Sequence, residues 1–486
     1  MLKTLAISLI ALACALTTSL SSDRPPNVIV ILVDDLGWMD LSCQGSDFYR
    51  TPSVDRLATE GMRFTNAYAA CAVCSPTRAA VQTGRYPHRV GVTDWIRSLF
   101  QRGNLGTPDA NPTEYVGSKK QKLLCPPNPY WMESEERTIA EVLDEAGYHT
   151  GYIGKWHLGD EPWFPEHQGY EKNKGGCDYG QPPSYFDPFN NPKGKHETIR
   201  NGIHNLPGRK QGEYLTHREA DEAEAMIREW KDEPFYLQVS HYAVHTPIQA
   251  IPEVAAKYED APGDHQKNAK YAAMVESVDD STRQILATLE ELRLEKDTLV
   301  IFTSDNGGLD NNSNPTDNAP LRSGKGYAYE GGIRVPFIVR WPGVAKAGQV
   351  SQVPVISTDL YPTCLAAAGL PPHPAQHRDG LDLRPVLEGG KSLDRDALFW
   401  HYPHYNSHPS SVPSSVIRAG DWKLIETFDP EGIELYHLGS DLSETTNLAE
   451  REPEKVKELR ARLESWRDEV DAEMMEPNPD YDPSAK

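Results

Sequence analysis

The sequence predicts an α/β protein with a large, mostly parallel sheet flanked by helices, followed by a smaller C-terminal subdomain with an antiparallel sheet and a helix. Continuous apolar runs rich in β-branched residues indicate strands buried on both faces. Between these runs, apolar residues recur three or four positions apart, and such strand-helix alternation is typical of a parallel sheet. Beyond about residue 385, short runs alternate with turn residues, which favours an antiparallel sheet.

Four runs predict the strands of the parallel sheet, at 27–33 (NVIVILV), 148–153, 235–240 (FYLQVS) and 298–303 (TLVIFT). The helices expected between them span 52–60, 138–146 and about 275–292. Pro52 lies just inside the first helix, and Gly61 and Gly147 lie just past the ends of two helices, as is usual at helix boundaries. In the C-terminal part, strands are expected at 397–400, 415–418, 422–425 and 434–438, before a closing helix from Glu454.

We expect four parts along the 486 residues: a signal peptide at 1–22, the α/β domain at 23–385, the antiparallel subdomain at 386–475 and a flexible tail at 476–486. The N-terminus has a short basic head and an apolar core that stops at Ser21, which is typical of a secretory signal. The protein is therefore expected to be exported, either periplasmic or secreted. A lipid anchor on Cys14 is the alternative, and no other run approaches the roughly 20 apolar residues of a membrane span.

Composition excludes several classes of function. With 38% hydrophobic and 25% charged residues the chain is typical of globular proteins, and its net charge of −22 argues against nucleic acid or an anionic membrane as a partner. A site for an anion must therefore be built locally. The six cysteines outside the signal are too sparse for a disulfide framework; one or two bridges are possible, and the sequence does not pair them.

Each of the four strands of the predicted sheet ends in polar residues. The carboxyl ends of parallel strands meet at one edge, where ligands bind in open α/β sheets, so we expect these tails to gather there. Two of the tails, at 34–35 and 304–308, supply Asp34, Asp35, Asp305 and Asn306. These oxygen ligands suit a hard cation such as Ca²⁺ or Mg²⁺ and not zinc.

Residues 71–84, CAVCSPTRAAVQTG, predict a helix with a cysteine at its start. Ser75 is the expected N-cap and Pro76 the first helical residue, with the helix running to about Thr83. Cys74 would then lie just ahead of a helix N-terminus, where an acidified, reactive thiol is expected. Arg78, in the first turn, could reach an anion bound at this helix N-terminus. This pattern alone does not exclude a purely structural Cys74 or a disulfide bridge between Cys74 and Cys71.

The motif Cys74-Ser75-Pro76-Thr77-Arg78, followed by AAVQTGR, resembles the signature of the type I sulfatases in the alkaline phosphatase superfamily. Further similar runs follow in the expected order: TGYIGKWHLG, HTPIQA, TSDNGG and LRSGKGYAYEGGIRVPFIVRWPG. The resemblance extends from residue 27 to about 424. Within the family, the chain resembles the N-acetylgalactosamine-6-sulfatase and arylsulfatase A-like enzymes. It implies a sulfuric ester hydrolase with an alkaline-phosphatase-like fold.

The resemblance also implies the cofactors and the role of each matched residue. Cys74 would be oxidised to formylglycine by a maturation enzyme and hydrated to a diol. One Ca²⁺ would be bound by Asp34, Asp35, Asp305, Asn306 and the modified Cys74. Arg78 would hold the nucleophile and its loop, and Lys155 and His157 would bind the nucleophile's oxygens. His245 and Lys325 would hold the sulfate ester on its leaving-group side.

Physical chemistry supports these residue types. A cation, two lysines and an arginine would stabilise the charge that develops on a sulfate ester during its cleavage. His245 would protonate the departing alcohol, and His157 would take a proton from the nucleophile. His241 is left open, since it could line the pocket or cap a strand, and the remaining histidines are expected to be structural.

Three stretches could bind the substrate: 92–131 with Trp95, Arg97, Phe100 and Arg102; 177–189 with Asp178 and Tyr179; and 401–408 with His401 and His404. Aromatic rings with polar partners suit a sugar. Together with the resemblance, they suggest a sulfated galactose or N-acetylgalactosamine unit of a polysaccharide. The sequence does not decide whether sulfate is removed from O4 or from O6. It also does not decide between endo and exo action on the polysaccharide.

Two alternatives to a sulfatase remain. A phosphomonoesterase or phosphonate hydrolase of the same superfamily would share the metal carboxylates, although the sequence shows no second set of metal ligands. A chain in which Cys74 stays unmodified would be a non-catalytic saccharide-binding protein. The chemical state of position 74 separates this second alternative from the enzyme.

Overall fold

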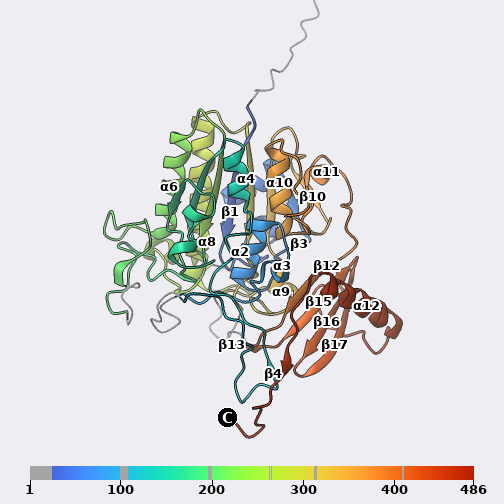
Figure 1. Ribbon diagram of the computed structural model, residues 1–486. Helices are drawn as coiled ribbons and strands as arrows, with labels where there is room; N and C mark the ends of the chain where they lie inside the picture. The colour runs from blue at the N-terminus through green and yellow to red at the C-terminus, as the bar shows by residue number, and fades with distance from the viewer. Residues whose placement is uncertain are drawn as a thin grey trace, which may run out of the picture.

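The computed structural model describes residues 24–98, 108–194, 200–261, 263, 265–310, 315–407 and 410–485 (Figure 1). The predicted signal peptide at 1–22, with Cys14, lies outside these ranges, as do Phe100 and Arg102 of the first candidate substrate stretch. Within the described ranges, no helix is both long and apolar enough to cross a membrane.

The centre of the molecule is an eight-stranded sheet with the order β10-β2-β9-β8-β1-β7-β5-β6. Every neighbouring pair is parallel except the two made by β9, which runs antiparallel to β8 and β2. The predicted α/β fold class is therefore confirmed. The strands are β1 Asn27–Val33, β2 Met62–Phe64, β5 His149–Gly154, β6 Lys172–Lys174, β7 Phe235–His241, β8 Thr298–Ser304, β9 Phe337–Arg340 and β10 Gln349–Ser351.

Helices cover both faces of this sheet (Figure 1). One core lies between the sheet and α1 Pro52–Glu60, α6 Leu215–Glu229 and α8 Ala269–Glu291. The other core lies under α2 Cys74–Thr83, α4 Ile139–Glu145 and α10 Leu360–Ala367. Along β1, Ile29 and Ile31 belong to the first core, while Val28 and Val30 belong to the second. Alternate side chains thus bury opposite faces, which explains the unbroken apolar run in the sequence.

A four-stranded antiparallel sheet with the order β12-β15-β16-β17 lies beside the main sheet in Figure 1. Leu459, Leu463 and Trp466 of α12 Pro453–Glu469 pack against it. The strands are β12 Leu398–Tyr402, β15 Ser414–Ala419, β16 Trp422–Phe428 and β17 Glu431–His437. All four predicted strands and the closing helix are therefore present.

The remaining elements are short. The strands are β3 Ala67–Tyr68, β4 Leu123–Leu124, β11 Val355–Ile356, β13 Asn406–Ser407, β14 Ser410–Ser411 and β18 Glu476–Pro477. The helices are α3 Pro87–Val90, α7 Pro252–Ala255, α9 Glu330–Ile333 and α11 Arg384–Leu387. Single 3-10 turns occur at Ser42–Gln44, Glu161–Trp163, Pro165–His167, Ala256–Tyr258 and Ser357–Asp359.

The expectation of a flexible tail at 476–486 is wrong for most of that segment. β18 pairs antiparallel with β4, with Glu476 opposite Leu124. Asn478 Nδ2 then donates hydrogen bonds to the carbonyl oxygens of Ser118 and Gln121, at 2.9 and 2.7 Å. The strand pairing and these side-chain hydrogen bonds hold the segment against the loop that contains β4. The prediction was based on proline content and did not anticipate such a partner strand.

A buried charge cluster joins the C-terminal sheet to the α/β domain. Lys423 Nζ of β16 lies 2.9 Å from Glu330 Oε1 of α9 and 2.8 Å from Glu444 Oε1. Glu330 also accepts from Arg334 Nε at 2.7 Å and from Tyr68 Oη at 2.8 Å. Lys423, Glu330 and Glu444 are fully buried. Charges buried this completely depend on one another, because none can be solvated.

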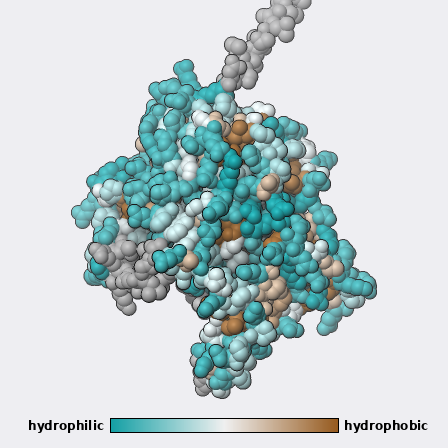
Figure 2. All heavy atoms as spheres, viewed as in Figure 1, coloured by the Kyte–Doolittle hydropathy of each residue, from teal (hydrophilic) through white to brown (hydrophobic). Residues whose placement is uncertain are grey.

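One face of the surface and the cysteine thiols are as expected for a globular chain. The face in Figure 2 is mostly hydrophilic, with scattered apolar residues. The cysteines of the described ranges, Cys43, Cys71, Cys74, Cys125, Cys177 and Cys364, are all free thiols. The bridges left open by the sequence are therefore absent among these six.

Candidate active site

The four strands whose ends are polar are direct neighbours in the sheet, in the order β8-β1-β7-β5. Val33 at the end of β1 pairs with Ser304 on one side and His241 on the other. The segments that follow these strands therefore start side by side at one edge. These segments carry the metal-ligand candidates, together with Lys155, His157 and His245. The predicted gathering of the four tails is confirmed.

Three buried carboxylates meet three cations at this edge. Lys155 Nζ donates to both carboxylate oxygens of Asp34, at 3.0 and 2.8 Å. Lys325 Nζ lies 2.7 Å from Asp35 Oδ1 and 2.9 Å from Asp35 Oδ2. The third carboxylate, Asp305, is described with its arginine below. Both lysines thus contact proposed metal ligands.

Arg78 connects the cysteine helix to the metal-ligand candidates. Its Nε and Nη2 atoms lie 2.8 and 2.7 Å from Asp305 Oδ2, and its Nη1 atom donates to the carbonyl oxygen of Lys155 at 2.6 Å. The guanidinium is buried, as is the carboxylate. Arg78 therefore holds together loops that follow two different strands.

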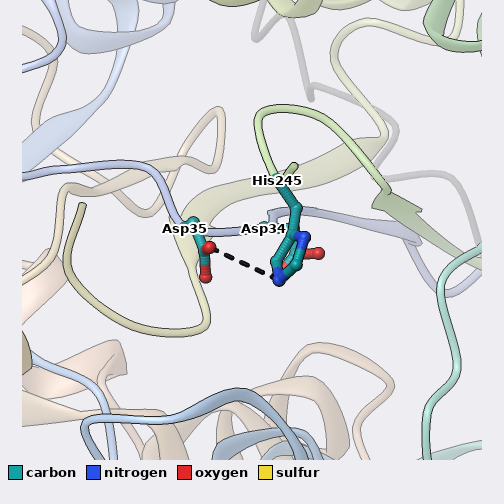
Figure 3. A group of neighbouring side chains, drawn as sticks. All are labelled: Asp34, Asp35 and His245. Carbon is teal, nitrogen blue, oxygen red and sulfur yellow. Dashed lines mark ion pairs between the residues drawn. The ribbon is translucent and has the colours of Figure 1, made fainter. Parts of the chain in front are cut away.

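The residues present fit a hard cation. Asp34, Asp35 and His245 offer ligand atoms that all lie within 4.8 Å of one another, and Figure 3 shows His245 pointing toward Asp35. Asn306 Nδ2 donates to Asp35 Oδ1 at 2.8 Å, while the buried Asn306 Oδ1 has no hydrogen-bond partner in the described structure. An unsatisfied buried acceptor beside two carboxylates is what an oxygen-coordinated cation would satisfy.

Further features of the cluster support a metal site. Asp35 has a φ of +59°, a left-handed conformation that is unusual for a residue other than glycine and is typical of functional sites. Burial disfavours the charged form of Asp35, but Lys325 and His245 lower its pKa below the ordinary value. Asp35 is therefore an anion, ready to bind a cation. Among the described residues, no other group of three or more such side chains could share one ion.

The helix that carries the cysteine begins earlier than predicted. Its first residue is Cys74 and its N-cap is Val73, so Ser75 is not the cap. The Ser75 hydroxyl instead donates to the carbonyl oxygen of His157 at 2.9 Å and accepts from the Ile96 amide at 2.9 Å. It is used to fix two loops at the site. Gly84 ends the helix with a φ of +68°, as expected.

Cys74 faces a histidine that is prepared to accept a proton. Cys74 Sγ lies 3.4 Å from His157 Nδ1, and His157 Nε2 donates to the carbonyl oxygen of Ile96 at 2.6 Å. With the proton on Nε2, assigned from that bond, the Nδ1 lone pair points at position 74. Burial, and secondarily Lys155, lowers the pKa of His157 well below its ordinary value, so the ring is neutral.

The expectation of an acidified thiol is wrong. Burial raises the pKa of Cys74, and the nearby charges of Lys155 and Lys325 only partly oppose this effect. The helix N-terminus is near, but the loss of hydration dominates. An unmodified Cys74 is therefore a protonated, weakly nucleophilic thiol in this surrounding.

A cavity of about 170 Å³ opens beside Cys74. Its wall contains four predicted catalytic residues, Cys74, His157, His245 and Lys325. Trp95 and Arg97, which were predicted to bind substrate, also line it. The guanidinium carbon of Arg97 lies 4.5 Å from the centre of the Trp95 ring, so the two side chains stack.

Four other predicted substrate residues do not line this cavity. Asp178 and Tyr179 are buried beside it, while Gly180 and Gln181, which follow them, form part of its wall. The sequence named the right segment but could not give the direction of each side chain. Thr246 and Leu309 were not predicted to line it; Thr246 lies in the HTPIQA run, whereas no sequence signal distinguishes Leu309 from an ordinary loop residue.

His401 and His404 also lie away from the cavity, contrary to expectation. His401 Nδ1 is 2.7 Å from Ser415 Oγ of the paired strand, and His404 Nε2 is 2.8 Å from Thr93 Oγ1. Both rings are buried. The next residues of the same segment, Tyr405 and Asn406, line the cavity. The C-terminal subdomain thus does contribute to the wall, but through other side chains.

His241, which the sequence left open, is structural. Its Nδ1 atom lies 2.6 Å from Glu219 Oε2 and its Nε2 atom 2.9 Å from Ser281 Oγ, and the side chain is fully buried between the sheet and α6 and α8. His245 is different. It lines the cavity, and burial together with Lys325 lowers its pKa to about 3, so its imidazole is neutral in the resting site.

Comparison with known proteins gives consistent matches. The family model described as Sulfatase matches residues 26–370, and that described as N-sulphoglucosamine sulphohydrolase, C-terminal, matches residues 323–470. The N-acetylgalactosamine-6-sulfatase of Canis lupus familiaris is 33% identical over 408 residues, covering 81% of this chain and 72% of that protein. Arylsulfatase A of Homo sapiens is 32% identical over 441 residues, covering 85% and 77%.

A solved structure extends this similarity over nearly the whole chain. The crystal structure of Ps i-CgsB in complex with k-i-k-neocarrahexaose has a TM-score of 0.76 and 29% sequence identity. The match covers 91% of this chain and 93% of that one. It therefore includes both the α/β domain and the C-terminal sheet.

Proposed function

This chain belongs to the sulfatase family and is a sulfuric ester hydrolase, and from that premise we propose that it removes sulfate from a sulfated carbohydrate. The observation that carries the proposal is the meeting, at one small cavity, of Cys74, the His157 lone pair and Lys325, whose ammonium is paired with Asp35 of the acidic cluster. We propose an O4- or O6-sulfated galactose or N-acetylgalactosamine unit. A relative named for N-acetylgalactosamine 6-sulfate and a neighbour solved with neocarrahexaose support this choice.

The proposed nucleophile is formylglycine, made from Cys74 by a maturation enzyme, with one Ca²⁺ bound by Asp34, Asp35, Asp305, Asn306 and position 74. When present, the two groups supply an attacking hydroxyl and a Lewis acid that polarises the sulfate. The chain's own residues provide the proton transfer, because His157 Nδ1 faces position 74 with a free lone pair. The Ile96 carbonyl fixes the tautomer that this role requires.

Lys325 would bind the sulfate, and the buried cations of the site would together stabilise charge in the transition state. Lys325 lines the cavity and can contact a sulfate oxygen without leaving Asp35. Arg78 and Lys155 hold Asp305 and Asp34 in place from behind the cavity. Preorganised charges of this kind require no rearrangement when the substrate arrives, which is the main source of their catalytic effect.

His245 is proposed to protonate the departing sugar oxygen. The negative charge of a bound sulfate ester would raise the imidazole pKa from its resting value of about 3. We expect His245→Ala to lower kcat on a sugar sulfate by roughly 10²–10⁴-fold, because an alcohol is a poor leaving group. With 4-nitrophenyl sulfate, whose leaving group needs little protonation, the loss is expected to be much smaller. Steady-state kinetics on both substrates measure this difference.

The control for this experiment is His217→Ala, on the surface of α6 and outside the cavity wall. It should leave both substrates unaffected. Equal losses on the two substrates for His245→Ala would contradict a proton donor and indicate a binding role only.

Removal of the metal ion is expected to abolish most activity without unfolding the protein. The three carboxylates are already paired with three cations, so the apo site has no net excess of buried negative charge. We expect EDTA to lower kcat by about 10²-fold or more while the circular dichroism spectrum is retained. Added Ca²⁺ should restore the rate and raise Tm, since it binds the folded state alone. Full activity in chelator would exclude the proposed cofactor.

Mass spectrometry of protein from the native host tests the function directly. The tryptic peptide that ends at Arg78 contains Cys74. An aldehyde or its hydrate at this position supports the sulfatase mechanism, and an intact thiol would point to the saccharide-binding alternative. A screen of O4- and O6-sulfated galactosides, with 4-nitrophenyl phosphate and a phosphonate ester beside them, then separates the substrates and the phosphohydrolase alternative. We also propose export to the periplasm or the medium, based on residues 1–22.

A further inference from the structure

A second, larger cavity lies next to the proposed active site. It has a volume of about 610 Å³, against about 170 Å³ for the cavity beside Cys74. The two are separated by one short stretch of chain, because Thr246 lines the smaller cavity and Ile248, Gln249 and Ala250 line the larger one. His245 stands at the start of this stretch.

The topology places the second cavity at the same edge of the sheet. β7 and β8 are both parallel to β1, so both end at the active-site edge. The chain leaves β7 at this edge, and α8 carries it back to the start of β8 at the opposite edge. The first residues of α8, Ala269 and Lys270, therefore lie at the active-site edge, and both line the cavity.

The lining combines apolar surface with unneutralised positive charge. Phe186, Ile248 and Pro252 provide apolar surface, and Lys267 and Lys270 are exposed at the wall, where Glu259 is the acidic residue. Within the part of the chain that the structure describes, neither lysine forms an ion pair. By contrast, nearby Lys257 is paired with Glu276. Two lysines against one glutamate give this lining a local excess of positive charge in a chain with a net charge of −22.

The chemistry of the reaction indicates what this site would bind. His245 is proposed to protonate the departing sugar oxygen, so the sugar lies on the His245 side of the sulfate. An oligosaccharide that continues from that sugar would pass over residues 246–250 and enter the second cavity. An apolar surface for the ring face and cations for an acidic substituent match one unit of an anionic saccharide.

We propose that the cavity lined by Ile248, Lys267 and Lys270 is a subsite for a neighbouring unit of the substrate chain, and that the two lysines bind a sulfate or carboxylate group on it. This inference rests on the proposed function. It makes the enzyme selective for sulfated oligosaccharides that carry a second anionic group over single sulfated sugars.

The test compares substrates of different length in the double variant Lys267→Gln/Lys270→Gln. A sulfated galactose hexasaccharide, the corresponding monosaccharide sulfate and 4-nitrophenyl sulfate are the substrates. We expect KM for the hexasaccharide to rise about tenfold, with kcat unchanged and both small substrates unaffected. The wild-type KM for the hexasaccharide should also rise with salt more steeply than in the variant, because exposed charge pairs are screened.

The matched control is Lys210→Gln/Lys257→Gln, which removes the same charge from exposed positions outside the cavity lining. An equal rise in KM for both double variants would reduce the effect to general charge and overturn the subsite. An unchanged KM in the Lys267/Lys270 variant would overturn it as well. A change in oligomeric state on gel filtration, without a change in KM, would assign the cavity to a second copy of the chain.

Failure of the proposed function is distinguishable from failure of the subsite. Turnover of 4-nitrophenyl sulfate by wild-type protein reports on sulfatase chemistry alone. If that turnover is absent, calorimetric titration of the hexasaccharide into wild type and the double variant still measures the subsite directly. Equal affinities in that titration would overturn the inference, and a roughly tenfold weaker affinity of the variant supports it.

Discussion

Replacing Cys74 with alanine is expected to lower kcat by roughly 10⁴-fold or more, because alanine has no thiol and cannot be converted to the formylglycine proposed as the nucleophile. The side chain lies at the cavity wall and 3.4 Å from His157 Nδ1, so its loss leaves the proton acceptor without a partner. The fold should persist, since a buried cysteine replaced by alanine loses one small atom. Turnover of a sugar sulfate and of 4-nitrophenyl sulfate, together with Tm, measures both effects.

The matched control is Cys71→Ala, three residues earlier in the same loop and also buried. Cys71 lies outside the active-site cavity lining and should retain wild-type kcat with a comparable change in Tm. Residual activity of Cys74→Ala above about a hundredth of wild type would mean that another group attacks sulfur. That result would exclude the formylglycine mechanism.

Replacing Lys423 with methionine is expected to lower the free energy of unfolding by about 3–5 kcal/mol. The ammonium lies between the carboxylates of Glu330 and Glu444, and none of the three is exposed. Without it, two buried carboxylates lose their shared counter-charge while the methionine fills nearly the same volume. Urea unfolding, followed by circular dichroism, measures the difference from wild type.

The loss in the Lys423→Met variant should depend on pH. Burial raises the pKa of Glu444 in the native protein, and Lys423 is the main influence opposing it. The variant therefore raises that pKa further. A carboxyl whose folded pKa is raised loses stability as pH increases above its ordinary range, so the deficit should be larger at pH 8 than at pH 5.

Lys455→Met is the control for this second prediction. Lys455 belongs to α12 of the same subdomain and pairs with Glu458 at the surface. Exposed pairs contribute little, so its effect should stay below about 1 kcal/mol at either pH. Similar losses in both variants, or a loss at Lys423 that does not vary with pH, would show that the buried charges are not the cause.

Much of the site could be predicted from the sequence because parallel strands impose their own geometry. The four strands with polar ends proved to be neighbours, so Asp34, Asp305 and His245 meet without any further information. The apolar runs were continuous because alternate side chains of β1 fill two cores. In such a sheet, the position of a residue along the chain fixes the edge at which it lies.

What the sequence could not give were the direction of loop side chains and the effect of burial. Segment 401–408 reaches the cavity, but Tyr405 and Asn406 line it while His401 turns to Ser415. The thiol at position 74 was expected to be acidic from its helix, whereas loss of hydration outweighs the helix. Both outcomes depend on packing between distant segments, which local patterns do not record.

The pairing of β18 with β4 has a practical consequence for handling the protein. Asn128 of the loop after β4 donates to the carbonyl oxygen of Trp95, at 3.1 Å, and thus supports the cavity wall from outside. The last residues of the chain brace that loop from its other end. Removal of residues 476–478 would therefore act on the loop behind the Trp95–Arg97 stack, and protein for kinetic work should retain these residues.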